Sequence, residues 1–99
     1  MYLVRDIMYC KPGKVRPMVE KFIALSKLLS AQGLGSMRVM TDVVAERYWT
    51  VVAEMEVTSI EQHAEMARTA MQSPEMQAAM KDYHDLVIKG RREVYNIEG

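Results

Sequence analysis

Charged side chains occur at regular positions in runs of residues that have the composition of β-strands. Arg5 lies in the first run, and Arg38 and Asp42 lie four residues apart in the second. Glu54 lies in the third run. An arginine can bind an anionic or carbonyl oxygen, and a carboxylate with a shifted pKa can act as a general base. These residues predict either a polar site for a small organic molecule or a network of ion pairs at an interface, because buried charges must be paired.

Aromatic and histidine side chains extend this set of candidates. Tyr48 or Tyr9 would orient a bound molecule, and Trp49 would either line the site or anchor the core. His84 lies beside the apolar stripe of a predicted helix, in a structural or a binding role. His63 and His84 have no spacing typical of a metal site, and we predict none. We predict a ligand-binding site formed by Arg5, Tyr48, Trp49 and His84, in which Arg5 and His84 are the catalytic candidates.

The composition argues against several classes of function. Thirteen Lys and Arg residues balance thirteen Asp and Glu residues, so no basic field favours a nucleic acid or an anionic membrane. No uncharged stretch is long enough to cross a bilayer, and charges among the first eleven residues argue against a secretory signal. The single cysteine, Cys10, cannot form an internal disulfide. We expect a cytoplasmic protein in a reducing compartment, with no predicted cofactor.

The elements that must position these residues follow from hydrophobic periodicity. Alternating apolar residues predict strands over 2–10, 37–44, 48–57 and 92–98, and apolar stripes predict helices over 13–32, 58–72 and 74–89. Thr58 and Glu61 are spaced as a capping box, and Ser73-Pro74 is typical of a helix start. The order βαββαβ predicts one α+β domain over residues 1–99. We expect a ferredoxin-like antiparallel sheet of four strands with its helices on one face.

The two faces of the predicted sheet have different partners. Side chains alternate along a strand, so Arg5 and Asp6 point to opposite faces. The helix-facing residues of the third strand are Trp49, Val51, Ala53, Met55 and Val57. Its other face carries Tyr48, Thr50, Val52, Glu54 and Glu56. The first strand is apolar on both sides, and an uncovered apolar face would be a large exposed patch. We therefore expect a homodimer through the open face.

Two places in this arrangement could hold a ligand. One is the space between the two sheets of the dimer, and the other, where we expect the ligand, is the cleft between the helices and the sheet. The chain has ten methionines, whose flexible side chains fill cores and also form adaptable apolar pockets. We therefore predict a small, largely apolar organic ligand.

Short motifs resemble those of a known family. They are Tyr2-Leu3-Val4-Arg5, Lys11-Pro12-Gly13-Lys14, Ser73-Pro74-Glu75-Met76-Gln77 and Gly90-Arg91-Arg92-Glu93-Val94-Tyr95. Together they resemble NIPSNAP-like proteins of the dimeric α+β barrel superfamily. The resemblance implies a ferredoxin-like protomer and a homodimer whose two sheets close into a barrel.

The resemblance implies two alternative functions, and the polar residues of the open sheet face suggest a third. Superfamily members include antibiotic-biosynthesis-type monooxygenases that need no cofactor, so the chain would bind, and as an enzyme oxidise, an apolar organic molecule. Haem-degrading relatives carry a histidine before the last strand, a tryptophan on the third strand and an asparagine on the first. His84 and Trp49 match these places, with His84 as the implied axial haem ligand, whereas the first strand has Asp6 and no asparagine. The third alternative is a non-enzymatic dimeric interaction module.

Overall fold

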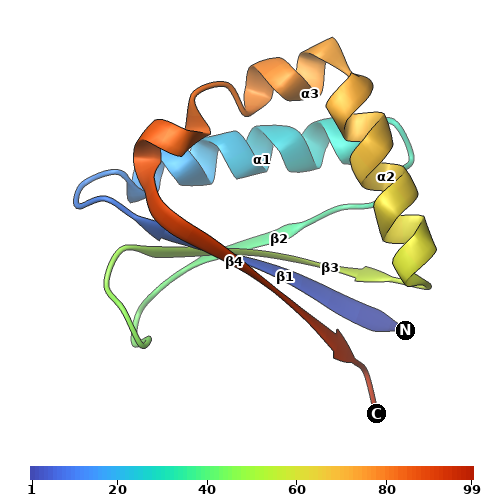
Figure 1. Cartoon of the computed structure of the whole chain (residues 1–99), viewed down its shortest axis with the longest axis horizontal. Helices are drawn as coiled ribbons and strands as arrows, with labels where there is room; N and C mark the ends of the chain where they lie inside the picture. Colours follow the sequence, from blue (N-terminus) through green and yellow to red (C-terminus); the bar gives the residue numbers. More distant parts are fainter.

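The computed structural model describes residues 1–99 and contains one sheet with a layer of helices. In chain order the elements are β1 (Tyr2–Cys10), α1 (Val15–Ala31), β2 (Arg38–Thr41), β3 (Thr50–Val57), α2 (Ile60–Gln72), α3 (Pro74–Ala79), the 3₁₀ turn η1 (Tyr83–Leu86) and β4 (Val87–Asn96). The strands pair antiparallel in the order β2-β3-β1-β4. All helices cover the same face (Figure 1). This arrangement confirms the predicted ferredoxin-like α+β fold.

The central strand β1 sets the register of the sheet. Arg5 lies opposite Glu54 on β3 and opposite Glu93 on β4. Since side chains alternate, Val4 and Cys10 point to the helices and pack in the core, while Arg5 points to the open face. The predicted opposition of Arg5 and Asp6 is therefore confirmed, with Asp6 on the helix side.

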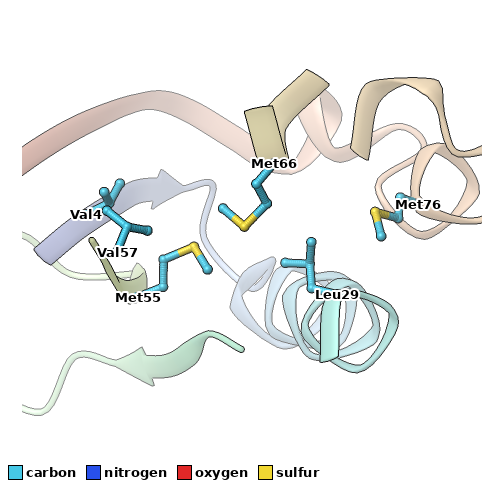
Figure 2. Close-up of a cluster of buried hydrophobic side chains, with 6 residues drawn as sticks. All are labelled: Val4, Leu29, Met55, Val57, Met66 and Met76. Atoms are coloured by element: carbon cyan, nitrogen blue, oxygen red, sulfur yellow. The ribbon is translucent and has the colours of Figure 1, made fainter. Parts of the chain in front are cut away.

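The core lies between the helices and the sheet. The predicted apolar stripe of α1 buries four side chains there, those of Met18, Val19, Phe22 and Leu29. Figure 2 shows one part of this core, in which Met66 of α2 and Met76 of α3 pack in one cluster with Leu29, Met55, Val57 and Val4. Burying one such side chain stabilises the fold by about 1.5–3 kcal/mol. None of the helices combines the length and apolarity needed to cross a membrane.

Capping side chains fix the starts of the second and third helices. Ser59, rather than the predicted Thr58, caps α2: its hydroxyl accepts the amide N–H of Gln62 at 3.0 Å. The Gln62 side chain in turn accepts the amide N–H of Thr58 at 2.7 Å, so the reciprocal cap starts one residue later than predicted. Ser73 caps α3 as predicted, with Pro74 in the first helical position.

Several predicted boundaries were wrong. Helix α3 ends at Ala79, ten residues before the predicted end, because Asp82 adopts a left-handed conformation with φ 62° and a 3₁₀ turn follows. β4 consequently begins at Val87, five residues earlier than predicted. At the other end of the sheet, β2 stops at Thr41 and β3 starts at Thr50. Trp49 has φ 64°, which interrupts the extended backbone, so residues 42–49 form a β2–β3 loop.

Candidate functional site

A buried carboxylate lies at the centre of the open face. Glu54 is 5% exposed, and its two oxygens accept hydrogen bonds from Arg38 and from Arg5 Nε, the latter at 3.0 Å. The predicted pairing of Arg5 and Arg38 with Glu54 is thus present within one chain. Asp42 is outside this network, because its carboxylate accepts the amide N–H of Thr50 at 2.9 Å.

The two arginines determine the protonation of Glu54. The hydrogen bond from Arg38 holds the pKa of Glu54 below its ordinary value of 4.5, and the hydrogen bond from Arg5 adds to this, against burial, which raises the pKa. The carboxylate is therefore ionised and both oxygens are occupied. A carboxylate with a lowered pKa is a weak general base, so Glu54 is suited to hold Arg5 and Arg38 rather than to accept a substrate proton.

The pocket with the most lining residues, called the main pocket below, lies on the open face under the β2–β3 loop rather than in the cleft between helices and sheet, and has a volume of about 290 Å³. The loop projects from the end of the sheet to the side opposite the helices (Figure 1). Ile7, Met40 and Val52 provide the apolar sheet surface of the pocket, and Arg5 is one of its polar residues. Thr50 fastens the loop at both ends, since its amide N–H is bound by Asp42 and its hydroxyl donates to the carbonyl of residue 47 at 2.8 Å.

Tyr9 and Arg47 form a wall between the main pocket and a second pocket. Tyr9 is 4% exposed, and the Arg47 guanidinium lies 4.6 Å from the centre of its ring, a cation–π distance. Both residues also line the second pocket, which has a volume of about 340 Å³ and includes Tyr48 and Trp49. The loop therefore separates two adjoining hollows, one centred on the sheet and one at its end.

The structure brings three of the four predicted ligand-binding residues to these two pockets. Arg5 lines the main pocket, whereas Tyr48 and Trp49 line the second. Trp49 was predicted to lie within the third strand and face the helices. This was wrong, because its left-handed backbone places it in the loop and leaves 43% of it exposed. It also contacts a hollow beside Val15 of α1, so it lies at the corner between the loop and the helix layer.

His84 lies apart from the other candidates. It is exposed on η1, and its ring centre is 4.0 Å from that of Tyr83. Neither the main pocket nor the second pocket includes it. A haem bound through His84 would therefore lie outside both pockets. The exposed surface around His84 does not form the enclosed site that such a ligand needs. The catalytic roles of Arg5 and His84 stay predictions.

The sequence did not single out three cations of the site. Arg47 lies in the loop, and Lys89 and Arg91 lie on the part of β4 that was predicted to be helix or strand end. The spacing of Lys89, Arg91 and Glu93 could have indicated the two cations of β4, because residues two apart share one face of a strand and β4 starts at Val87.

A second charged cluster lies on the helix side of the sheet. Arg92 binds the Asp6 carboxylate with two nitrogens, at 2.6 and 3.5 Å. His63 of α2 lies near this pair. Burial lowers the pKa of His63 below 6.5, and the positive charge of Arg92 lowers it further, whereas Asp6 raises it. No group of three or more His, Cys, Asp or Glu side chains is arranged to hold a metal ion.

Comparisons with known proteins identify the class of fold. Neither a protein-family model nor a curated protein sequence matches the chain. Solved structures do match. An uncharacterised NIPSNAP-like domain protein from Burkholderia xenovorans has a TM-score of 0.81 at 16% identity, over 98% of this chain and 84% of that one. A NIPSNAP family protein from Agrobacterium tumefaciens has a TM-score of 0.82 at 13% identity, over 98% and 92%.

The same fold also occurs in a second group of proteins. A candidate antibiotic biosynthesis monooxygenase from Nitrosomonas europaea has a TM-score of 0.74 at 12% identity, and the match covers 98% of both chains. The fold of this chain is therefore the one shared by NIPSNAP-family and antibiotic-biosynthesis-monooxygenase-like proteins, as the sequence resemblance implied.

Proposed function

We propose that the protein is a homodimer that binds a small, largely apolar organic molecule in the main pocket. The observation that carries the proposal is the hollow itself, in which Ile7, Met40 and Val52 form an apolar surface and the β2–β3 loop forms one side. Binding pockets for small molecules combine such apolar walls with a few polar groups that orient the ligand. Arg5, held in place by Glu54, is one such group.

The open face of the sheet supports the proposed dimer, because it is the face that a second copy of the chain would cover. Helices cover only one face, and the other retains half-exposed side chains such as Tyr95 at its edge. A row of charges runs across this face from Arg38 through Glu54 and Arg5 to Glu93. Paired charges of this kind fix the register of an interface, while the apolar residues between them contribute the burial.

The enzymatic version of this proposal is oxygenation of the bound molecule without a cofactor. The fold shared with the candidate monooxygenases supports it. In such a reaction one atom of molecular oxygen enters the substrate, and the substrate itself supplies the two electrons that reduce the other atom to water. Oxygen uptake that depends on the added substrate would support this version, and binding without uptake would contradict it.

Native mass spectrometry of the protein, as purified from its host, tests the proposal. We expect a species at twice the 11.4 kDa chain mass, carrying an extra mass that is lost under denaturing conditions. A Val52→Asp variant should lose this extra mass, because a charge on the pocket floor disfavours an apolar ligand. An Ile60→Asp variant is the matched control, since Ile60 is half-exposed at the start of α2. An 11.4 kDa species alone at micromolar concentration would contradict the dimer.

A further inference from the structure

Three cations gather around one buried aromatic ring. The charged groups of Arg47, Lys89 and Arg91 lie 4.6, 5.7 and 5.9 Å from the centre of the Tyr9 ring, which itself is 4% exposed. The sheet explains two of these contacts, because Lys89 is the direct partner of Tyr9 across β1 and β4, and Arg91 is two residues further along the same face. The β2–β3 loop supplies the third.

Two of these cations have no acidic partner. The other arginines near the sheet have acidic partners: Arg5 and Arg38 share Glu54, Arg92 pairs with Asp6, and Arg91 pairs with Glu93 at 3.0 Å. No carboxylate lies within 4.0 Å of Arg47 or Lys89. The chain has as many acidic as basic residues, so the two cations lack partners because of their positions and not because carboxylates are few. Glu46 lines the main pocket beside Arg47 and is not paired with it.

We propose that Arg47 and Lys89, assisted by Arg91, bind the carboxylate of an organic acid whose apolar body occupies the main pocket. This inference rests on the proposed function and names the class of ligand. Hydrogen bonds between a guanidinium or ammonium group and a carboxylate are about twice as strong as neutral ones. The Tyr9 hydroxyl makes no hydrogen bond within the chain and is available as a further donor.

The charges that line the main pocket favour a carboxylate over a phosphate. Three arginines line it, namely Arg5, Arg47 and Arg91, together with the two acidic residues Asp42 and Glu46. Arg5 and Arg91 are already paired with Glu54 and Glu93, so the cations without an acidic partner are Arg47 in the lining and Lys89, which lies outside the lining beside Tyr9. A dianionic phosphate would face the carboxylates of Asp42 and Glu46 with too little compensation, whereas a monoanion is repelled less by them. The site is therefore expected to select ligands by charge at one end and by apolar contact at the other.

The experiment compares ligands that share one apolar body. Octanoate, octanol and octyl phosphate are titrated into the purified full-length protein and followed by isothermal titration calorimetry. We expect octanoate to bind about tenfold more tightly than octanol, because hydrogen bonds to charged groups contribute about that factor. Lys89→Met and Arg47→Met should each remove most of this advantage. Lys89→Met should also leave octanol binding unchanged, because Lys89 does not line the main pocket. Arg47→Lys, which keeps the charge, should restore part of it.

Matched controls separate this inference from the proposed function. Arg68→Met removes an exposed charge on α2 and should leave octanoate affinity unchanged. Equal binding of octanoate and octanol would overturn the carboxylate site while leaving the apolar pocket intact, and binding of neither would overturn the proposed function itself. Tighter binding of octyl phosphate would overturn the choice of a carboxylate. Weaker self-association of Lys89→Met, with unchanged octanoate affinity, would assign the cations to the dimer interface and also overturn the inference.

Discussion

Replacing Glu54 by glutamine removes the charge at the centre of the open face and keeps the size of the side chain. We expect the free energy of unfolding to fall by about 1–3 kcal/mol, because hydrogen bonds to a charged group contribute about that much. The loss should stay below the ~3–5 kcal/mol typical of a fully buried pair. The reason is that the Arg5 side chain remains 35% exposed and the Arg38 side chain 72% exposed, so water can solvate both after the change.

A double-mutant cycle isolates the contact between Glu54 and Arg5. Glu54→Gln, Arg5→Met and the double variant are unfolded in urea at one fixed protein concentration, because the stability of the proposed dimer would depend on concentration. We expect a coupling energy of about 1 kcal/mol or more, since the Glu54 side chain is only 4% exposed. Arg68 and Glu65, 61% and 73% exposed on α2, form the control pair, which should couple by about 0.5 kcal/mol or less. Equal coupling in the two pairs would refute the argument from burial.

The lowered pKa of Glu54 also predicts how stability depends on acid. The unfolded chain takes up this proton near the ordinary value of 4.5, whereas the folded chain takes it up only at lower pH. The contribution of Glu54 is therefore complete above pH 4.5 and is lost as the pH falls through its folded pKa. Urea midpoints measured between neutral pH and pH 3 should fall less steeply for Glu54→Gln than for the parent, and parallel curves would contradict the assignment.

Three other changes test separate parts of the structure. Because folding lowers the pKa of His63, its contribution to the free energy of unfolding is complete above pH 6.5 and is lost as the pH decreases from there. In urea unfolding, His63→Gln should therefore make stability less dependent on pH below 6.5. Cys10 is 2% exposed and burial raises the pKa of its thiol, so Ellman's reagent should react with the folded protein about a hundredfold more slowly than with the protein unfolded in urea. Similar rates in the two states would show that the end of β1 opens in the folded protein. Gly90→Ala places a Cβ 2.9 Å from the Met8 sulfur and should lower the free energy of unfolding, measured by thermal unfolding, by about 1–2 kcal/mol. In the double variant with Met8→Ala the two losses should be less than additive, because the clash is removed.

Local patterns in the sequence were enough to predict the fold and the faces of its sheet. The alternation of β3 correctly assigned Val51 and Ala53 to the core and Glu54 to the open face, because a strand has no freedom to place neighbours on one side. The stripe of α1 was equally decisive, since Met18 and Phe22 recur on one face of the helix.

The missed boundaries depend on contacts between distant segments. Periodicity continued the last helix through Tyr83 and Val87, yet the chain turns at Asp82 and pairs Val87 with Cys10 of β1. β4 pairs with β1 over Tyr2–Cys10, so its backbone groups are hydrogen-bonded in the sheet and the helix cannot continue through them. The pocket was missed for the same reason: Arg47 and Tyr9 are far apart in the sequence, and only the closed loop brings them into contact.

Trp49 gives this protein an unusual optical property. The single tryptophan lies half-exposed in the β2–β3 loop at the edge of the second pocket, outside the apolar core. Its emission will therefore respond to solvent and to molecules at that edge, whereas circular dichroism follows the helices and strands. If the loop detaches before the sheet melts, the two signals will give different midpoints. That difference would reflect where the fluorophore lies and would not by itself indicate a partly folded core.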